Sequence, residues 1–350
     1  MKLDNISNPV VTIVMTTFRR PNLLKCAIKS VLRQTYPYFE IRVYDDASGD
    51  ETEEVVSEFS KVDPRIHFHS HEKNLGNFID NINFGISRVT TPLWTVLSDD
   101  NLFLPNFLKI AVQDFEKHPQ AIFCAQQVIL MQDDGGIHTV CPSNAWRPGF
   151  YKPLEGLHAC IKDPSFFGGA IYRYKAIEEI GLMDRDTNEV SDWDYIFRSV
   201  CRFPFFINLK PGVILRFNIA TSLSGKTQSR YTWPHWHKML NNMTSYSSNS
   251  AVVKSADIQL KKRLRRMLIE QGKASARTGN FEDSSLSANT LKKFFRSYNY
   301  FLYLSFLNIL LRNIPRLRKF FLLSQEKKSE EKQEKRNQNY SHYMKYKKYL

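Results

Sequence analysis

The first hundred residues alternate between strand-like and helix-like stretches, and few folds accommodate that order. Residues 10–15 and 93–97 are continuous apolar runs, and residues 40–44 alternate in character and carry β-forming side chains. Residues 22–33 place apolar side chains on one helical face, and residues 51–59 open with the acidic residues typical of the first turn of a helix. Strands separated by helices predict an α/β fold.

Each predicted strand leads into a turn whose residues could meet a ligand. Thr16 and Phe18 follow the first strand, Asp46 follows the second, and Asp99 and Asp100 follow the third. In an open α/β sheet this edge is where ligands bind. The adjacent carboxylates favour a hard cation and a phosphate-bearing ligand, because two such charges are costly without a cation nearby. An Asp-Asp-Asn sequence is also good turn chemistry, so the residues alone leave both interpretations open.

Three ordered segments resemble the signatures of inverting family 2 glycosyltransferases with the GT-A fold. They are residues 11–18, 44–50 and 98–101, the last followed by Leu104-Pro105. The similarity covers roughly residues 9–220 and is greatest to bacterial enzymes of the spore-coat and capsular polysaccharide type. It implies a Rossmann-like mixed sheet with flanking helices.

The resemblance gives each strand end a role. Thr16 and Phe18 would line the pocket of the nucleotide base, Asp46 would bind the base, and Asp99 would also contact the nucleotide. Asp100 stands where the family places a ligand of the divalent cation, Mn²⁺ or Mg²⁺, that bridges the donor diphosphate. Such a cation neutralises the leaving diphosphate as its bond to the sugar breaks. The implied donor is a nucleotide-diphosphate sugar, with UDP as the expected nucleotide.

An inverting displacement also needs a carboxylate that takes the proton of the acceptor hydroxyl. The resemblance assigns this role to Asp192, downstream of an acceptor loop that contains Gly168 and Gly169. Trp193 and Asp194 are expected on the same acceptor or diphosphate side. From the residues alone, Asp192 could instead be the N-cap of the helix that follows it.

Two segments near the end of the matched region raise alternatives. Arg216 is expected either to meet the diphosphate or to be a surface arginine. Residues 220–227 satisfy a relaxed Walker A pattern, but Ala220 replaces the first glycine and no later strand supplies a metal-binding Asp. A P-loop phosphotransferase is therefore a minor alternative. A catalytically inactive nucleotide-sugar-binding relative is the other, because Ser98 and Ser191 replace acidic residues of the family's motifs.

Histidines occur in two groups. His67, His69 and His71 alternate, which is metal-like spacing, but no fourth ligand lies nearby, so we expect a solvent-facing strand edge. His235 and His237 stand beside tryptophans and suit either contact with an acceptor sugar or a packed aromatic turn.

Positive charge is concentrated in the C-terminal part of the chain. Residues 1–253 contain 26 Lys and Arg against 27 Asp and Glu, whereas residues 254–350 contain 23 against 8. Residues 291–323 mix aromatic and aliphatic side chains with flanking basic ones, and their apolar core is too short to span a bilayer. This composition favours an interfacial helix on anionic lipid. Packing on the catalytic domain or on a second subunit is the alternative.

These observations divide the chain into a GT-A catalytic domain over residues 1–225, a mostly helical region over 226–323 and a charged tail over 324–350. The Lys/Glu/Gln-rich start of the tail predicts disorder or a solvated helix. Nothing in the chain resembles a module that reads RNA or DNA, so nucleic acid is not an expected partner. The basic tail and the resemblance together point to a glycan or lipid-linked glycan acceptor.

The remaining features concern location. Five cysteines without CxxC spacing indicate reduced thiols in a cytoplasmic protein. Residues 1–8 lack the basic start of a signal peptide. The expected location is the cytoplasm, peripheral to the inner face of the plasma membrane.

Overall fold

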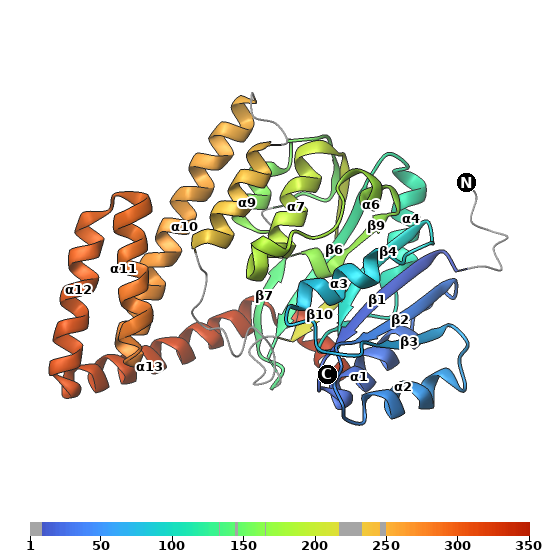
Figure 1. The fold of residues 1–350 in the computed structure, drawn as a ribbon, viewed down its shortest axis with the longest axis horizontal. Helices are drawn as coiled ribbons and strands as arrows, with labels where there is room; N and C mark the ends of the chain where they lie inside the picture. Colours follow the sequence, from blue (N-terminus) through green and yellow to red (C-terminus); the bar gives the residue numbers. More distant parts are fainter. Residues whose placement is uncertain (1–8, 133, 144–145, 165, 217–232, 246–249) are drawn as a thin grey trace.

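A mixed β-sheet lies at the centre of the structure, a computed structural model that describes residues 9–132, 134–143, 146–164, 166–216, 233–245 and 250–350 (Figure 1). The strands are β1 (Val11–Thr17), β2 (Phe39–Asp45), β3 (Ile66–Ser70), β4 (Leu93–Ser98), β5 (Leu102–Phe103), β6 (Phe123–Met131), β7 (Ile137–Cys141), β8 (Gly149–Tyr151), β9 (Ala170–Arg173) and β10 (Phe205–Arg216). Their order is β3-β2-β1-β4-β9-β6-β10-β5, with β7 on β6 and β8 on β10. The strands β1 to β4 pair in parallel, whereas β9 is antiparallel to β4 and β6.

Helices cover both faces of this sheet, which confirms the predicted α/β class. They are α1 (Pro21–Leu32), α2 (Thr52–Ser60), α3 (Phe78–Ile86), α4 (Phe107–Lys117), α5 (Leu157–Lys162), α6 (Lys175–Glu179) and α7 (Ser191–Arg202), with short 3₁₀ segments η1 (Phe167–Gly169) and η2 (Arg185–Val190). Side chains of β1 alternate between two cores. Ile13 and Met15 join the core that contains Leu24 of α1, and Val14 joins the core that contains Ile79 of α3.

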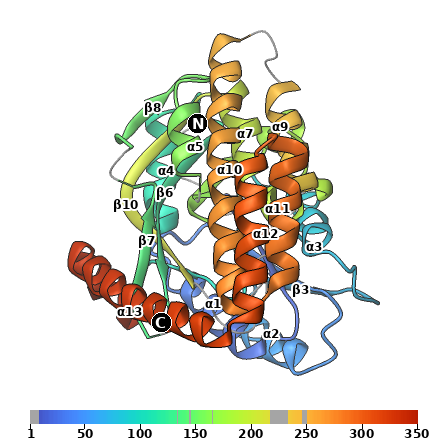
Figure 2. The same ribbon diagram turned by 90° about the vertical axis from the view of Figure 1, so that its left-hand side faces the viewer.

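A helical region follows the sheet and extends away from it (Figure 1). It contains α9 (Trp233–Ser245), α10 (Ala251–Thr278), α11 (Phe281–Phe295), α12 (Tyr298–Asn313), α13 (Pro315–Asn339) and the 3₁₀ segment η3 (Ser341–Tyr349). Figure 2 shows α10, α11 and α12 side by side. The chain turns at Gly279 and Arg296, both left-handed, and again before Pro315. The segment 291–323 is therefore divided among three helices, where the sequence predicted one.

The last part of the chain returns to the sheet. Of the two states that the sequence allowed for the charged run, the structure shows the helix, α13, and its side chains are largely exposed. Near its end Asn337 Oδ1 accepts a hydrogen bond from Ile137 N of β7. The residues after α13 pack on the catalytic domain, with Tyr343 only 8% exposed, so the end of the chain lies beside the sheet (Figure 1). This differs from the predicted disordered tail.

None of the helices among the described residues combines the length and apolar character that crossing a bilayer requires.

Candidate active site

Backbone pairing brings the predicted site residues to one edge of the sheet. β1 lies between β2 and β4, and the register places Thr17 opposite Asp45 and Thr16 opposite Ser98. Beyond these pairs, Asp46 N donates to Thr17 O at 3.0 Å, and Asp99 N donates to Thr16 O at 3.2 Å. The ends of all three strands therefore meet, as the sequence predicted for parallel neighbours.

Arg20 bridges the two adjacent carboxylates at this edge. Its Nη2 lies 2.5 Å from Asp99 Oδ1 and its Nε lies 3.1 Å from Asp99 Oδ2, while its Nη1 lies 2.9 Å from Asp100 Oδ2. Thr17 Oγ1 adds a 2.7 Å hydrogen bond to Asp99 Oδ2. The sequence analysis missed Arg20. Arg20 lies in the turn after β1, and the neighbouring strand β4 ends in the acid pair. That position is the sequence signal that could have indicated its role.

The two carboxylates differ in access to solvent. The Asp99 side chain is fully buried, and that of Asp100 is 11% exposed. Burial raises the pKa of Asp99 to about 7, against the opposing pull of Arg20. Burial also raises the pKa of Asp100, while the charges of Arg20 and Arg216 lower it. Asp100 is therefore the carboxylate that a ligand can reach, and a ligand contact by Asp99 requires Arg20 to move.

The surroundings of Asp100 suit a cation that arrives with a phosphate ligand. Asn101 N donates to Ser98 O, which closes the turn, and Asn101 Oδ1 accepts from Arg216 N at 3.1 Å. Within the described parts of the chain, no group of three acidic, histidine or cysteine side chains could hold a metal alone. Mg²⁺ and similar ions are commonly held by one or two carboxylates, together with water and substrate phosphates. The residues present fit that mode, with Asp100 as the protein ligand.

Asp46 holds a loop in place beside the strand ends. The residue is 6% exposed, and its carboxylate accepts hydrogen bonds from Asn74 Nδ2 at 3.0 Å and from Leu75 N at 2.8 Å. Thr16 is half-buried, and the Phe18 ring is 37% exposed with the Arg19 guanidinium 4.9 Å from its centroid. An exposed ring near a buried carboxylate is suited to a base pocket, and that role stays a prediction.

Asp192 lies in the first turn of α7. The N-cap of this helix is Val190, and no side chain caps it, so the alternative role of Asp192 as the N-cap is wrong. Asp192 Oδ1 accepts a hydrogen bond from Trp193 N at 2.8 Å. Burial raises its pKa to about 6, which leaves the carboxylate ionised at neutral pH and close to the value that suits a general base.

The acceptor loop forms η1, which packs against α7. A Cβ atom at Gly169 would lie 2.5 Å from Gln126 O, whereas one at Gly168 would lie 3.3 Å from the flexible end of Leu215. Glycine at position 169 is therefore required by close packing on β6. Gly168 carries no such constraint.

Trp193 and Asp194 belong to the packing of α7. Asp194 is fully buried, its Oδ2 accepts from Arg198 Nε at 2.7 Å, and its Oδ1 accepts from Asn242 Nδ2 at 2.9 Å. The Arg263 guanidinium lies 4.9 Å from the Trp193 ring centroid. Asp194 thus joins α7 to α9, and its expected place on the acceptor side stays a prediction.

Arg216 lies beside the acidic turn and is half-buried, so it is not a free surface arginine. Besides the bond from its backbone to Asn101, its Nη2 donates to Leu350 O at 3.1 Å. Its Nε is buried and has no acceptor among the described residues. Residues 220–227, which carry the Walker A-like pattern, lie outside the described residues.

The histidines occupy the positions that the sequence allowed, with His67 and His69 exposed on the strand edge as expected. β3 is an edge strand, and the rings of His69 and His71 lie 4.8 and 4.5 Å from the ring of Phe84. His235 Nδ1 lies 2.5 Å from Glu189 Oε2, and Trp233 beside it is 8% exposed.

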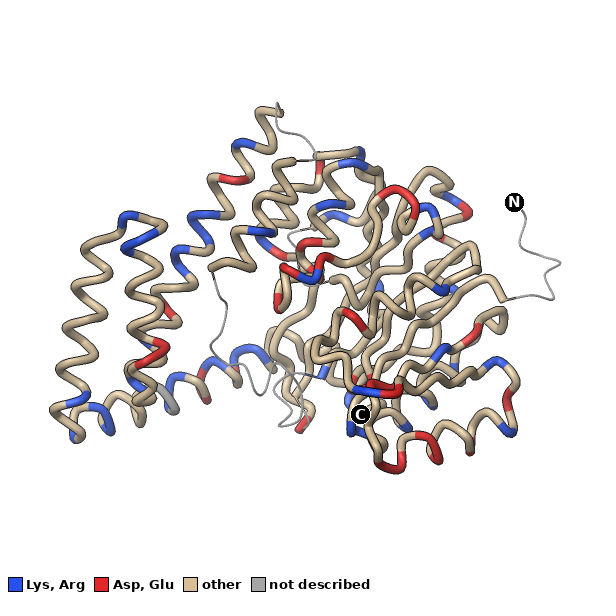
Figure 3. Tube along the Cα trace, in the orientation of Figure 1, with Lys and Arg blue, Asp and Glu red and all other residues tan. Residues whose placement is uncertain are grey.

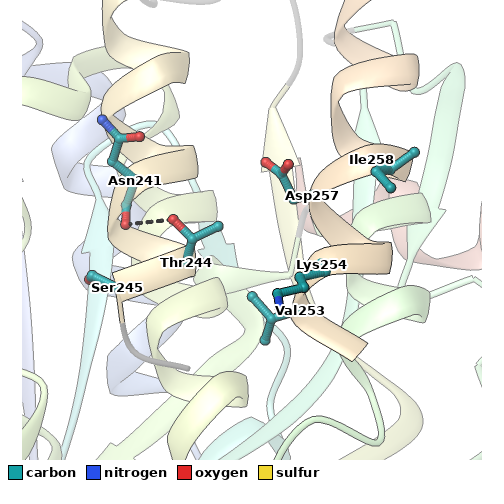
Figure 4. Close-up of a pocket in the computed structure, with 7 residues that line it drawn as sticks. All are labelled: Asn241, Thr244, Ser245, Val253, Lys254, Asp257 and Ile258. Carbon is teal, nitrogen blue, oxygen red and sulfur yellow. Dashed lines mark hydrogen bonds between the residues drawn. The ribbon is translucent and has the colours of Figure 1, made fainter. Parts of the chain in front are cut away.

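A pocket of about 370 Å³ lies elsewhere, between the end of α9 and the start of α10. Figure 4 shows Asn241 and Thr244 on one wall and Asp257 on the other. Its lining shares no residue with the strand-end site.

The comparisons with known proteins agree with this geometry. Residues 12–181 match the profile described as Glycosyl transferase family 2. An uncharacterized glycosyltransferase of Haemophilus influenzae is 29% identical over 198 residues, which are 56% of this chain and 59% of that protein. The GalNAc(5)-diNAcBac-PP-undecaprenol beta-1,3-glucosyltransferase of Campylobacter jejuni is 33% identical over 105 residues, 30% of this chain and 34% of that protein. The matched segments thus span one to two thirds of these relatives.

Solved structures show the same fold. Residues 1–349 of S. aureus TarS in complex with UDP-GlcNAc superpose with a TM-score of 0.62 at 15% identity, covering 82% of this chain and 81% of that one. The same fragment in another crystal structure gives a TM-score of 0.58 at 14% identity, with 82% and 80% covered. The fold is that of a GT-A glycosyltransferase. Within that class, residues 12–181 form a glycosyltransferase family 2 domain.

Proposed function

We propose that this protein transfers a sugar, with inversion, from a UDP-sugar to a hydroxyl of a glycan or lipid-linked glycan in bacterial cell-surface polysaccharide synthesis. The observation that carries the proposal is the position of Asp46 and Asp100 at the ends of β2 and β4, on either side of β1. Asp46 lies beside an exposed aromatic ring, and Asp100 is the accessible member of an acid pair. The TarS structures, which share the fold, are complexes with UDP and with UDP-GlcNAc.

The donor side follows from these positions. Asp46 accepts a hydrogen bond from the base, and the Phe18 ring covers it. Asp100 would hold Mn²⁺ or Mg²⁺, and the cation would supply positive charge to the leaving diphosphate. Arg20 keeps the acid pair from repelling the donor before the cation binds, because it already offsets one of the two negative charges. Arg216 adds a second positive charge at the same turn, and its Nε, which has no acceptor among the described residues, would be a donor for the diphosphate.

The acceptor side depends on Asp192. Its carboxylate takes the proton of the acceptor hydroxyl as that oxygen forms its bond to the anomeric carbon, and the bond between that carbon and the diphosphate oxygen breaks. The raised pKa of about 6 gives the carboxylate more affinity for this proton than an exposed aspartate has. Its ionised form still predominates at neutral pH.

The helical region supplies a surface for a membrane. Leu302, Phe306 and Ile309 repeat at helical spacing on α12 and are 63%, 63% and 62% exposed, while Leu304 and Leu307 on the opposite face are buried. In Figure 2 α12 is the helix of the region nearest the viewer. Lys and Arg are distributed along the neighbouring helices, which suits anionic headgroups (Figure 3). We place this apolar face of α12 on the cytoplasmic leaflet, where a lipid-linked acceptor would be presented; the C. jejuni relative is named for such an acceptor.

A donor screen tests the proposal. Purified full-length protein would be incubated with Mn²⁺ and a panel of UDP-, GDP- and TDP-sugars, and release of the nucleoside diphosphate would be measured. We expect release from one or more UDP-sugars, stimulated by the cognate acceptor and abolished by EDTA. The assay would also include an acceptor pool from the host membrane. If the protein then bound UDP but released no nucleoside diphosphate from any donor, the catalytic proposal would be contradicted.

A further inference from the structure

The residues after α13 pack against the catalytic domain. Residues 340–350, called here the terminal segment, cover a small apolar cluster that includes Leu102 and Leu104 beside the acidic turn and Ile214 of β10. In Figures 1 and 2 the end of the chain lies close to α1, far from α12. The segment therefore packs directly behind the strand ends that carry Asp100.

One buried tyrosine and several partly buried apolar side chains hold the terminal segment in this place. Tyr343 is its one buried residue among those described, and the Tyr343 hydroxyl donates a 2.6 Å hydrogen bond to the buried Gln127 Oε1. The side chain of Lys347 lies against Gly135 in the turn between β6 and β7. Most of the other side chains are exposed or half-exposed. A segment with so little buried surface has a docking free energy that one hydrogen bond can shift substantially.

The terminal segment reaches the acidic turn through Arg216. Leu350 O accepts from Arg216 Nη2, and Arg216 N donates to Asn101 Oδ1, so one arginine joins the segment to the turn that follows Asp100. Arg216 Nε remains buried without an acceptor among the described residues. A buried donor without a partner is costly, and a phosphate oxygen is a strong acceptor for guanidinium. The contact to Leu350 uses Nη2, so Nε is the guanidinium nitrogen that still lacks an acceptor.

We propose that the terminal segment is a positioning element of the donor site, which holds Arg216 so that its Nε meets an oxygen of the donor diphosphate. The proposal rests on the proposed use of a UDP-sugar. Docking of the segment and binding of the diphosphate then favour each other by the same factor, because the two equilibria are linked. Neither the residues of the segment nor Gln127 touch the donor.

Hydrogen exchange tests the linkage on the wild-type chain. Exchange in peptides that cover residues 340–350 would be followed with Mn²⁺ alone, with Mn²⁺ and uridine, and with Mn²⁺ and UDP. We expect UDP to slow exchange in the terminal segment and uridine to leave it unchanged, because uridine lacks the diphosphate. Equal exchange in all three conditions, with UDP binding demonstrated, would overturn the proposal.

Two variants test it by affinity. Tyr343→Phe removes only the hydroxyl that bonds Gln127, and Tyr343→Ala also removes the buried ring. We expect Tyr343→Phe to weaken UDP binding about five- to tenfold, the equivalent of one hydrogen bond, with a larger effect from Tyr343→Ala and no effect of either on uridine. Tyr174→Phe, at an exposed tyrosine of the catalytic domain, is the matched control.

The outcomes separate the two proposals. If wild-type protein binds no UDP with Mn²⁺ present, the proposed function fails. If wild-type protein binds UDP and the Tyr343 variants bind it equally well, the role of the terminal segment fails. Equal weakening of UDP and uridine binding, or a lowered melting temperature with unchanged affinity, would show a merely structural contact and also overturn the positioning role.

Discussion

Arg20 lies against Asp99 with two of its nitrogens, Nη2 at 2.5 Å from Oδ1 and Nε at 3.1 Å from Oδ2. The Asp99 side chain is fully buried, so the guanidinium is what allows a charged group at this depth. The first prediction concerns this pair. Arg20→Gln should lower the free energy of unfolding by about 1 to 3 kcal/mol, because the buried Asp99 carboxyl loses its hydrogen-bond partner and must take up a proton. Urea denaturation would measure the loss.

The same experiment has a control in an exposed pair. Lys25 Nζ lies 3.4 Å from Glu58 Oε2, and both side chains are well exposed. Lys25→Gln should change the unfolding free energy by less than about 1 kcal/mol. If Arg20→Gln were equally mild, the importance of the Arg20–Asp99 pair for the sheet edge would be contradicted.

Asp100→Asn should reduce turnover without unfolding the protein. Loss of the accessible carboxylate weakens binding of the cation and, through it, of the diphosphate. We therefore expect kcat to fall on the order of a hundredfold. The concentration of Mn²⁺ that gives half-maximal rate should rise, since a neutral amide is a weaker ligand. Steady-state kinetics over a Mn²⁺ series would show both effects, and an unchanged Mn²⁺ dependence would exclude Asp100 as the ligand.

Asp192→Asn should lower kcat by about 10²- to 10⁴-fold and leave UDP affinity unchanged. The wild-type rate should also depend on pH. The base is active when ionised, and its pKa is raised to about 6, so kcat should be level above that pH and fall as pH drops through it. If Asp192→Asn kept the wild-type rate, a residue other than Asp192 would have to be the base.

Gly169→Ala and Gly168→Ala form a matched pair that tests the packing of η1. The new methyl group at 169 would meet the backbone oxygen of Gln126 at 2.5 Å, whereas that at 168 would meet a movable Leu215 side chain at 3.3 Å. We expect the change at 169 to cost about 1 to 3 kcal/mol. The change at 168 should cost less than about 1 kcal/mol. Thermal denaturation of both variants would give the comparison, and equal costs would refute the close-packing argument.

The apolar face of α12 can be tested with anionic vesicles. Replacing Leu302, Phe306 and Ile309 together by serine should reduce co-sedimentation at least about tenfold, since three exposed apolar side chains lose their burial in the headgroup region. Val62→Ser, at a residue of the catalytic domain that is 79% exposed, should have no effect. Binding that is equal for both variants would assign the face to a protein partner instead.

The sequence predicted the sheet edge well because its signals are local. Apolar runs, helical periodicity and turn residues indicated where β1, β2 and β4 end, and parallel neighbours must bring those ends together. Arg20 escaped notice because its partners lie about 80 residues away and depend on β1 pairing with β4. The pair of Asp194 with Arg198 was missed for a similar reason, since nothing local distinguishes a buried pair from an exposed one.

The C-terminal region was harder to predict. Composition alone suggested one amphipathic helix over residues 291–323, whereas the breaks at Arg296 and Pro315 redirect the chain twice. The charged run predicted solvation, which α13 shows, but could not indicate that Tyr343 lies beyond it with a hydrogen-bond partner in β6. A long-range contact of this kind depends on the shape of the folded chain and on one buried hydroxyl. No local sequence pattern predicts it.

The hydrogen bond from Tyr343 to Gln127 joins residues that are 216 positions apart. A ribosome adds about 5 to 20 residues each second, so roughly 10 to 40 seconds separate the synthesis of the two partners. During that interval the apolar surface of β5, β6 and β7 is made but uncovered. The newly made chain thus has a period in which this surface is open to chaperones or to other nascent chains, and that period ends when the segment around Tyr343 docks.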